Sequence, residues 1–195
     1  MNTPLVSLKA IITFRGGGTP SKKIAEYWNG DIPWATVKDF KGLKLSETQD
    51  CISTKGLHKS SANLIPKGHV IIPTRMALGK AAINTIDLAI NQDLRALIPK
   101  GKIHTEYLLY ALLSLSGEIE KHGSGATVKG ITQENLYKLK IPLPTIDDQI
   151  RIATLLSRVE ALIATRKDNL RLLDEFLKST FLEMFGDPGQ NEKGL

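Results

Sequence analysis

The segment PLPTIDDQIRIATLLSRVEALIATRKDNLRLLDEFLKSTFLEMFG, residues 142–186, contains the longest run in the chain without an internal glycine or proline. The run begins after Pro144 and ends at Gly186, and it predicts one helix of about 40 residues, roughly 60 Å long at 1.5 Å per residue. Thr145 is suited to cap its start, and the two aspartates at 147 and 148 favour the first turn. Gly186 and Pro188 supply the stop.

Apolar residues recur along this predicted helix with alternating spacings of four and three. Eight of the ten positions in that register are apolar, the others being Arg166 and Thr180, which is typical of a coiled-coil seam. A domain of about 140 residues is only some 30 Å across, so it does not cover the whole seam, and a second helix is expected. A long helix packed on its own domain is the alternative. The predicted interface residues are Ile152, Leu156, Val159, Ile163, Leu170, Leu173, Leu177 and Met184.

The first 144 residues predict a globular domain of mixed helix and strand. Strands are expected at 70–72 and 94–98, with shorter ones at 81–83 and 88–90. One helix is expected from Thr105, as its cap, to Lys121. The fold class is therefore α+β, a mixed domain followed by a coiled-coil helix. The predicted domains are 1–144, a helix at 145–186 and a tail at 187–195.

Composition narrows the class of protein. The formal charge of +6 is uneven: residues 1–144 hold 19 basic and 11 acidic side chains, a net +8, whereas residues 145–195 are at −2. A basic domain is expected in a protein that binds a polyanion such as nucleic acid, although many basic proteins bind no polyanion. One cysteine, no long apolar run and no secretory signal predict a soluble, cytoplasmic protein.

No constellation of catalytic residues is visible in the sequence. The glycines at 16–18 precede Pro20-Ser21-Lys22 rather than the Gly-Lys of a phosphate-binding loop. The four histidines and Cys51 lack the paired spacing of a zinc site, and Cys51 has no adjacent base. We therefore expect no metal, no cofactor and no catalysis. Trp28 and Trp34 are interpreted as core or loop-anchoring aromatics.

Basic and amide side chains gather instead in predicted loops of the first domain. Arginine and lysine pair with guanine edges and phosphates, while asparagine and glutamine pair with adenine, so the set as a whole favours DNA binding. Each residue alone is more typical of an ordinary surface. The predicted DNA-binding residues are Arg15, Thr19, Ser21, Lys22, Lys23, Lys38, Lys41, Arg75, Lys80, Asn91, Gln92, Arg95 and Lys129, and Gln133 belongs to the same group.

Several short motifs are spread along the chain. They are GGGTPS at 16–21, YWNGDIPW at 27–34, Asn91-Gln92 between apolar strands, ATVKGI at 126–131, LKIPLP at 139–144 and QIRIA at 149–153. Together they resemble the specificity subunits of type I restriction–modification systems. Each is weak alone, but together they cover nearly the whole chain.

The resemblance implies a target-recognition domain and a long conserved helix that read one half of a bipartite target in double-stranded DNA. It also implies partners: a methylation subunit that modifies adenine and a restriction subunit that supplies ATP-dependent cleavage. The specificity subunit itself would be non-catalytic. Two alternatives remain open, namely the recognition module of a fused modification–restriction enzyme and a coiled-coil DNA-binding regulator.

The family pattern has two such units in one polypeptide with their helices antiparallel, whereas this chain has one. It is therefore either a half-subunit or a piece of a longer protein. For a half-subunit, the seam predicts a two-fold homodimer joined through residues 146–185. Such a dimer would recognise a palindrome split by an unread spacer.

Overall fold

The computed structural model describes residues 3–125 and 128–186, and contacts divide the chain into two units, Met1–Ala153 and Thr154–Leu195. The first unit contains every described strand, and the second, where described, is helical. In chain order, the elements are β1 (Leu5–Ser7), α1 (Leu8–Ile11), β2 (Ile12–Gly16), η1 (Ala25–Tyr27), β3 (Ile32–Ala35), η2 (Val37–Asp39), β4 (Lys44–Leu45), β5 (Asp50–Ile52), α2 (Thr54–His58), β6 (Asn63–Ile65), β7 (Val70–Pro73), β8 (Ala82–Asn84), β9 (Leu88–Ile90), β10 (Leu94–Pro99), α3 (Thr105–Ser114), α4 (Ser116–Lys121), α5 (Gln133–Lys138), β11 (Lys140–Pro142) and α6 (Ile146–Phe185).

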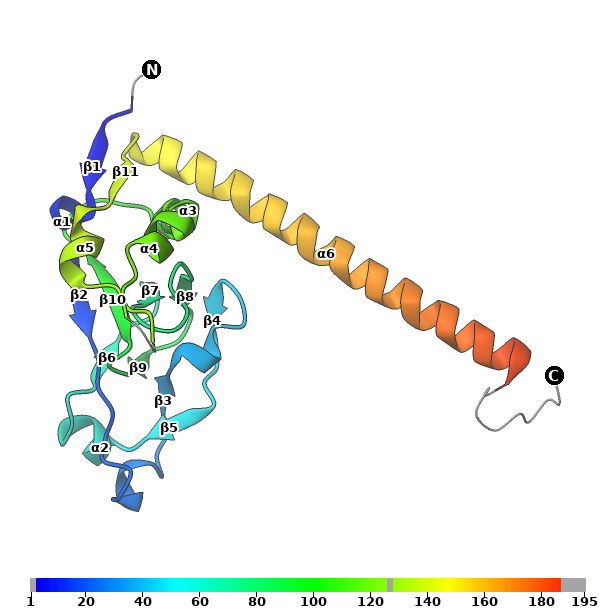
Figure 1. Cartoon of the computed structure of the whole chain (residues 1–195), viewed down its shortest axis with the longest axis horizontal. Helices are drawn as coiled ribbons and strands as arrows, with labels where there is room; N and C mark the ends of the chain where they lie inside the picture. Colours follow the sequence, from blue (N-terminus) through cyan, green and yellow to red (C-terminus); the bar gives the residue numbers. More distant parts are fainter. Residues whose placement is uncertain (1–2, 126–127, 187–195) are drawn as a thin grey trace. The chain divides into compact units, whose positions relative to one another are not determined.

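Three sheets organise the first unit (Figure 1). The five-stranded sheet has the order β2-β10-β7-β8-β4, and the four-stranded sheet has the order β5-β3-β9-β6. Most pairs are antiparallel, but β4–β8 and β3–β9 are parallel. The two-stranded sheet β1–β11 brings the two ends of this unit side by side. The predicted α+β class of the fold is confirmed, whereas the coiled coil stays a prediction.

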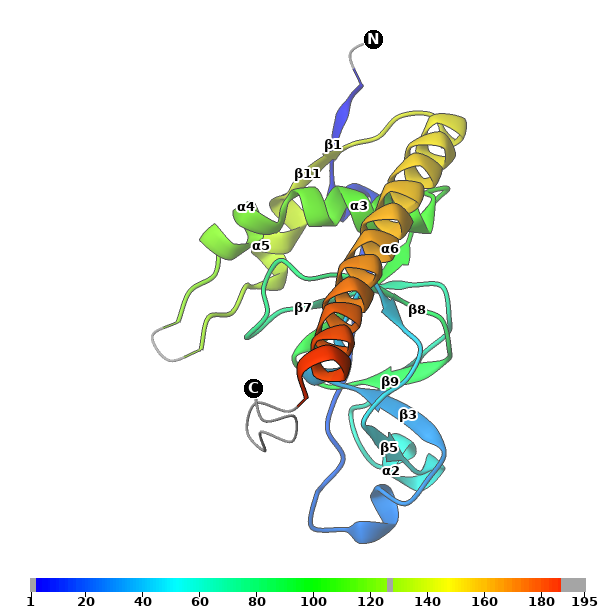
Figure 2. The ribbon, with the colours of Figure 1, turned by 90° about the vertical axis from the view of Figure 1, so that its right-hand side faces the viewer.

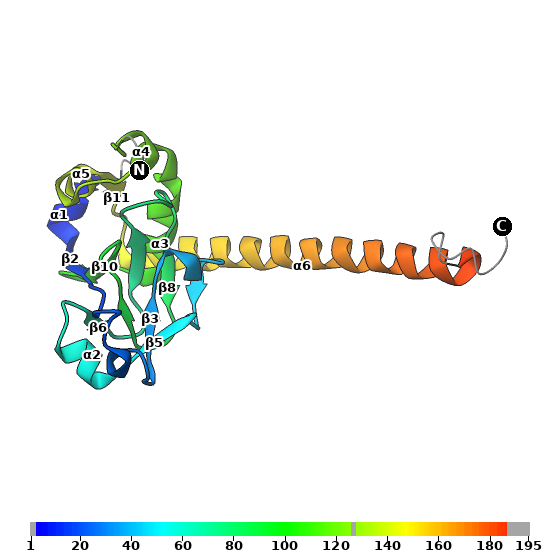
Figure 3. The same cartoon turned by 60° about the horizontal axis from the view of Figure 1, so that its bottom comes forward.

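The first unit is layered. Helices α1, α3, α4 and α5 lie with β1 and β11 at one end, the five-stranded sheet lies in the middle, and the four-stranded sheet lies with α2 at the other end (Figures 1 and 2). Figure 3 shows the same separation of α1, α4 and α5 from α2. One apolar cluster joins Leu108 and Leu112 of α3 to Phe14 and Leu97 of the middle sheet. A second cluster fills the space between the two larger sheets. The central strand β7 is therefore buried on both faces, as its apolar sequence predicts, whereas β2 alternates buried and exposed residues.

The predicted strands at 70–72 and 94–98 are confirmed as β7 and β10. The single helix predicted from Thr105 to Lys121 is wrong, because the chain forms two helices, α3 and α4, that part at Leu115. Near the break, the Ser114 hydroxyl donates to the Ala111 carbonyl at 2.8 Å. The predicted cap is also wrong: His104 is the N-cap, without a side-chain bond, and Thr105 is the first helical residue.

The long helix is confirmed as α6, a single unbroken helix of 40 residues (Figure 1). Its start is capped as predicted, because the Asp148 amide donates to the Thr145 hydroxyl at 3.3 Å and that hydroxyl donates to the Asp148 carboxylate at 2.9 Å. Gly186, at φ +77°, donates to the Leu182 carbonyl at 2.8 Å and ends it. Pro188 and the predicted tail lie outside the described residues.

The first two turns of α6 belong to the first unit. Gln149 is 2% exposed; its side-chain oxygen accepts from the His104 amide, and its nitrogen donates to the Pro144 carbonyl, each at 2.9 Å. Ala153 is fully buried. These contacts attach the start of α6 to the start of α3. Within residues 3–125 and 128–186, no helix is long and apolar enough to cross a bilayer.

Candidate nucleic-acid interface

A tight turn between β9 and β10 organises the polar surface of the first unit. The Asn91 side-chain oxygen accepts from the Asp93 amide at 3.0 Å, and its backbone carbonyl accepts from Leu94 at 3.3 Å. The Asp93 carbonyl in turn accepts from the Thr74 amide at 2.7 Å and from its hydroxyl at 3.0 Å. Asn91 and Asp93 are buried, so the turn is rigid and presents Gln92 to solvent.

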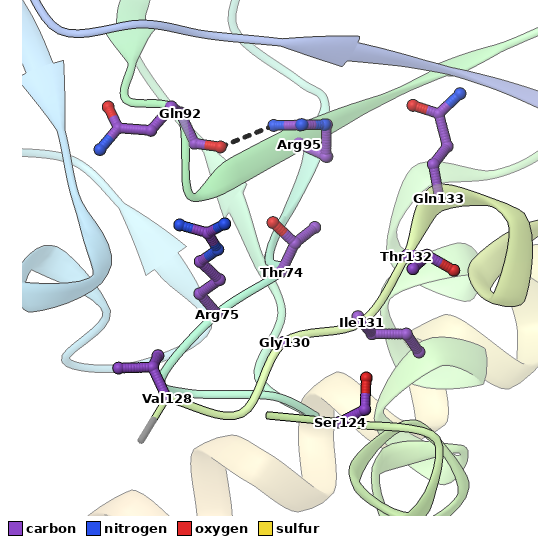
Figure 4. A pocket seen from close by; sticks show the side chains of 10 residues that line it. All are labelled: Thr74, Arg75, Gln92, Arg95, Ser124, Val128, Gly130, Ile131, Thr132 and Gln133. Carbon is purple, nitrogen blue, oxygen red and sulfur yellow. Dashed lines mark hydrogen bonds between the residues drawn. The ribbon is translucent and has the colours of Figure 1, made fainter. Parts of the chain in front are cut away.

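A cavity of about 710 Å³ opens beside this turn (Figure 4). Arg75 enters it from the loop after β7, Gln92 and Arg95 from the turn and the start of β10, and Gln133 from the start of α5. Three segments far apart in the sequence thus place donors around one space. Its lining residues are Thr74, Arg75, Gln92, Arg95, Ser124, Val128, Gly130, Ile131, Thr132 and Gln133.

The two arginines of this cavity each have a partner in or beside the turn. The Arg95 guanidinium donates to the Gln92 and Leu94 carbonyls, each at 2.8 Å. Arg75 lies 3.7 Å from the Asp93 carboxylate, and its side chain is 64% exposed. The described lining contains no acidic side chain. Two positioned guanidinium groups without a lining carboxylate favour an anionic or carbonyl-rich ligand.

A second cavity, of about 370 Å³, adjoins the first and shares Gln92 with it. Its cations are Lys22 and Lys38, both exposed. The Thr19 hydroxyl donates to the Gln92 side-chain oxygen. The Gln92 side-chain nitrogen donates to the Asp93 carboxylate at 3.4 Å, so both ends of this amide are held. We call the two cavities together the Gln92 site. The second cavity is lined by Thr19, Lys22, Trp34, Thr36, Val37, Lys38, Asp50, Met76, Asn91 and Gln92.

The glycine-rich loop supports this site by close packing. A Cβ on Gly17 would stand 1.9 Å from the Ile90 carbonyl oxygen, so no other residue fits there without a shift. The Trp34 indole donates to the Gly18 carbonyl at 3.0 Å, and Trp28 packs edge-on against Trp34 with ring centroids 5.0 Å apart. Lys22 lies 6.0 Å from the Trp28 ring. The interpretation of both tryptophans as anchoring aromatics is confirmed.

The structure brings together seven of the thirteen predicted DNA-binding residues. Arg75, Gln92 and Arg95 line the first cavity, and Thr19, Lys22, Lys38, Asn91 and Gln92 line the second. The pairing of β2 with β10 sets Arg15 opposite Ala96, and Arg95 on the other face of the sheet. Lys41 forms an ion pair with Glu47 at 3.1 Å. The predicted residues that line neither cavity are Arg15, Ser21, Lys23, Lys41, Lys80 and Lys129.

Sequence reasoning missed several lining residues, because their types carry no signal by themselves. Met76 and Val128 are apolar residues exposed by 62% and 47%. Thr74, Ser124 and Thr132 are small polar residues that the first cavity shares with Gly130. The only sequence hint was the glycine in the loop at 128–130. The bridge between Arg75 and Gly130 fixes that loop beside the end of β7.

An ion pair on α5 lies beside the site. A hydrogen bond and charge from Lys138 hold the pKa of the neighbouring Glu134 below its usual range, with the two groups 2.9 Å apart. Among residues 3–125 and 128–186, no three His, Cys, Asp or Glu side chains are placed to hold a metal ion.

Comparison with known proteins gives a family match and curated relatives. Residues 4–173 match the model of the type I restriction modification DNA specificity domain. The type I restriction enzyme MjaIX specificity subunit of Methanocaldococcus jannaschii is 34% identical over 193 residues, which cover 95% of this chain and 45% of that protein. The EcoR124I/EcoR124II specificity subunit of Escherichia coli is 34% identical over 154 residues, 75% of this chain and 38% of that protein.

Solved structures share the fold. The HsdS subunit from Thermoanaerobacter tengcongensis matches with a TM-score of 0.67 at 24% identity, over 85% of this chain and 39% of that one. The S subunit of a type I restriction-modification system from M. genitalium matches with a TM-score of 0.63 at 20% identity, over 95% and 49%. The chain spans less than half the length of each of these four proteins.

Proposed function

Because this chain belongs to the type I restriction modification DNA specificity domain family, we propose that it reads one half of a bipartite DNA target for such a system. In this proposal residues 1–144 recognise double-stranded DNA, and the helix at 145–186 is the scaffold. The chain performs no chemistry itself. A methylation subunit and a restriction subunit of the same system supply adenine methylation and ATP-dependent cleavage.

The observation that carries the proposal is the Gln92 site. Arg75 converges on one cavity with Gln92 and Arg95, although it comes from a different segment. Arginine donates two bonds to the guanine edge, and glutamine pairs with adenine through both its oxygen and its nitrogen, so these groups suit base edges in a major groove. Lys22 and Lys38 lie beside them and suit the phosphates that flank those bases. The proposed contacts are thus narrower than the full set predicted from sequence.

Asn91 takes a supporting role in this proposal. Its side chain is only 6% exposed and is occupied within the turn, so it positions Gln92 rather than pairing with a base. The six predicted residues outside both cavities are expected to contribute at most to general attraction of the phosphate backbone.

The scaffold is proposed to be a two-fold antiparallel homodimer. All eight apolar seam residues except Ile152 are exposed, and the described part of the second unit is a single helix with no other element to cover them. The seam positions are also symmetric about residue 168, because Ile163 and Leu173 are each five residues from it, as Leu156 and Thr180 are each twelve. A dyad at that position would pair Ile163 with Leu173 of the partner subunit and leave no seam position unmatched.

Mapping of methylated adenines tests the proposal directly. A genome that carries this chain with its methylation partner should show methylation at one split motif. Gln92→Ala should relax one base position in each half of that motif, because a lost bidentate contact costs about 1–3 kcal/mol of discrimination. Lys41→Ala is the matched control, since Lys41 is exposed, ion-paired and outside the site, and it should leave the motif unchanged. Methylation without a motif, or an identical motif after Gln92→Ala, would contradict the proposal.

The two alternative functions predict different outcomes. A fused modification–restriction enzyme would have catalytic sequence in the same reading frame. A coiled-coil regulator would bind its site tightly without a methylation partner. Neither alternative is favoured by the relatives, which are specificity subunits of type I restriction enzymes.

A further inference from the structure

Met76 has an unusual backbone and side chain for its position. It is the one non-glycine residue with positive φ in the described ranges, at +66°. The Ala77 amide donates to the Arg75 carbonyl at 2.8 Å, so Met76 is the centre of a three-residue turn of the strained, positive-φ type. Its side chain is 62% exposed. A long apolar side chain is thus held out toward solvent by a backbone conformation that such residues rarely adopt.

The surrounding structure fixes that conformation. Before the turn, the Thr74 amide donates to the Asp93 carbonyl at 2.7 Å, which ties it to the β9–β10 turn. At the turn, the Met76 amide donates to the Lys129 carbonyl at 3.2 Å, beside the bridge between Arg75 and Gly130. Strain that persists in a well-bonded segment at a site is a reason to look for a role of the residue that carries it.

Met76 lies among both polar and apolar side chains. It lines the second cavity with Gln92, Lys22 and Lys38, and its neighbour Arg75 lines the first. The other apolar residues of the second cavity are Trp34, which is buried, and Val37, which is half-buried, so Met76 is the exposed apolar side chain of its lining. Arginine, glutamine and lysine recognise the hydrogen-bonding edges of bases and the phosphates. The apolar feature of the major groove is the C5-methyl group of thymine, and none of those side chains can recognise it.

We propose that Met76 is a specificity-determining residue that contacts the C5-methyl group of a thymine next to the bases read by Arg75 and Gln92. This rests on the proposed function, because it requires the Gln92 site to face a major groove. The thioether side chain has three rotatable bonds, so it adapts to a methyl group without a preformed pocket. The strained turn keeps Met76 out of the domain core and available to the DNA.

The test replaces thymine by uracil, which removes the methyl group and keeps the base pair. The complex of the full chain with its methylation subunit is titrated with the mapped target duplex, and with duplexes that carry one deoxyuridine at each thymine position in turn. At one thymine position of the half-site, and at its equivalent in the other half, uracil should weaken binding about four-fold, the factor expected for loss of one buried methyl group at about 0.8 kcal/mol.

Variants of Met76 test whether this residue is the one that contacts the methyl group. Met76→Gly and Met76→Asn remove the apolar side chain, and both residue types accept positive φ, so the turn is retained. Each should bind the thymine duplex about as weakly as the wild type binds the uracil duplex, and each should be insensitive to uracil at that position. Leu64→Ala is the control, because Leu64 is a 40% exposed apolar residue of the same unit that lines neither cavity.

The outcomes separate the two proposals. Absence of any sequence-specific binding overturns the proposed function. Specific binding that tolerates uracil at every position, or Met76 variants that keep the wild-type sensitivity to uracil, overturns the role of Met76 alone. Equal weakening of all DNA sequences by the variants, with no uracil effect, also overturns it and indicates a wedge or a general contact instead.

Discussion

Replacement of Leu173 by glutamate is expected to dissociate the proposed dimer, whereas the same change at Leu172 is not. The two leucines are adjacent on α6 and exposed to nearly the same extent, 57% and 53%. Leu173 occupies a seam position and Leu172 does not. Comparison of the two variants therefore distinguishes loss of a seam contact from loss of any exposed apolar side chain. Ile163→Glu, at the position paired with Leu173 across the dyad, extends the series.

The expected change in the dissociation constant of the dimer follows from the exposed fractions of the replaced side chains. Full burial of a leucine or isoleucine side chain is worth about 1.5–3 kcal/mol. Leu173 is 57% and Ile163 43% exposed in the single chain, so each has about half of that still to gain, or ~1 kcal/mol. The double variant loses four such side chains per dimer, ~4 kcal/mol, and the dissociation constant rises about 1,000-fold. Glutamate charges at a buried seam add to this figure.

Sedimentation equilibrium of the full chain across a range of micromolar concentrations measures the effect, with circular dichroism as a check that the first unit stays folded. The wild type and Leu172→Glu should be dimers, and the Leu173→Glu, Ile163→Glu double variant should be a monomer. A wild type that sediments as a monomer at tens of micromolar would refute the half-subunit interpretation and favour a piece of a two-unit protein. Equal dissociation by Leu172→Glu would refute the seam.

Other expected outcomes concern the first unit. DNA binding should weaken steeply with salt, with a log–log slope of roughly −0.9 for each phosphate contacted, and a slope near zero would count against the interface. Gly17→Ala should lower the free energy of unfolding by about 1–3 kcal/mol in urea titrations, because its Cβ would meet the Ile90 carbonyl oxygen at 1.9 Å, whereas Gly42→Ala, which would meet nothing within 4 Å, should not. Burial raises the pKa of the Tyr107 phenol above its usual 10.0, so the unfolded chain ionises first and stability should be lost as the pH rises above 10. Tyr107→Phe should make that alkaline loss shallower, even though it removes the 2.6 Å bond to the Pro142 carbonyl, and an unchanged alkaline profile would contradict this. The purified chain alone should neither methylate nor cleave DNA, and an activity that survives removal of contaminants would overturn the non-catalytic assignment.

The sequence alone determined the features that depend on neighbouring residues. Capping by Thr145, a stop at Gly186 and forty intervening residues without glycine or proline define α6, because helix formation depends on contacts within a few positions. The strands at 70–72 and 94–98 were found for the same reason. The uneven charge distribution and the family motifs could also be recognised from the sequence alone, because both depend only on the order of residues along the chain. The misplaced boundary at Leu115 shows the limit of that reasoning, since the apolar pattern continues through Leu115 to Ile119 although the chain forms two helices there.

Only the tertiary structure decided which polar residues form one site. Thr19 and Gln92 are 73 positions apart, yet they share a hydrogen bond. The register of β2 on β10 sets Arg15 and Arg95 on opposite faces, although the two are equivalent by composition. The turn at Met76 depends on a carbonyl at Lys129, which no local pattern reveals. Side-chain convergence of this kind is fixed by sheet pairing and by packing between distant segments, and these have no signature within any short stretch of sequence.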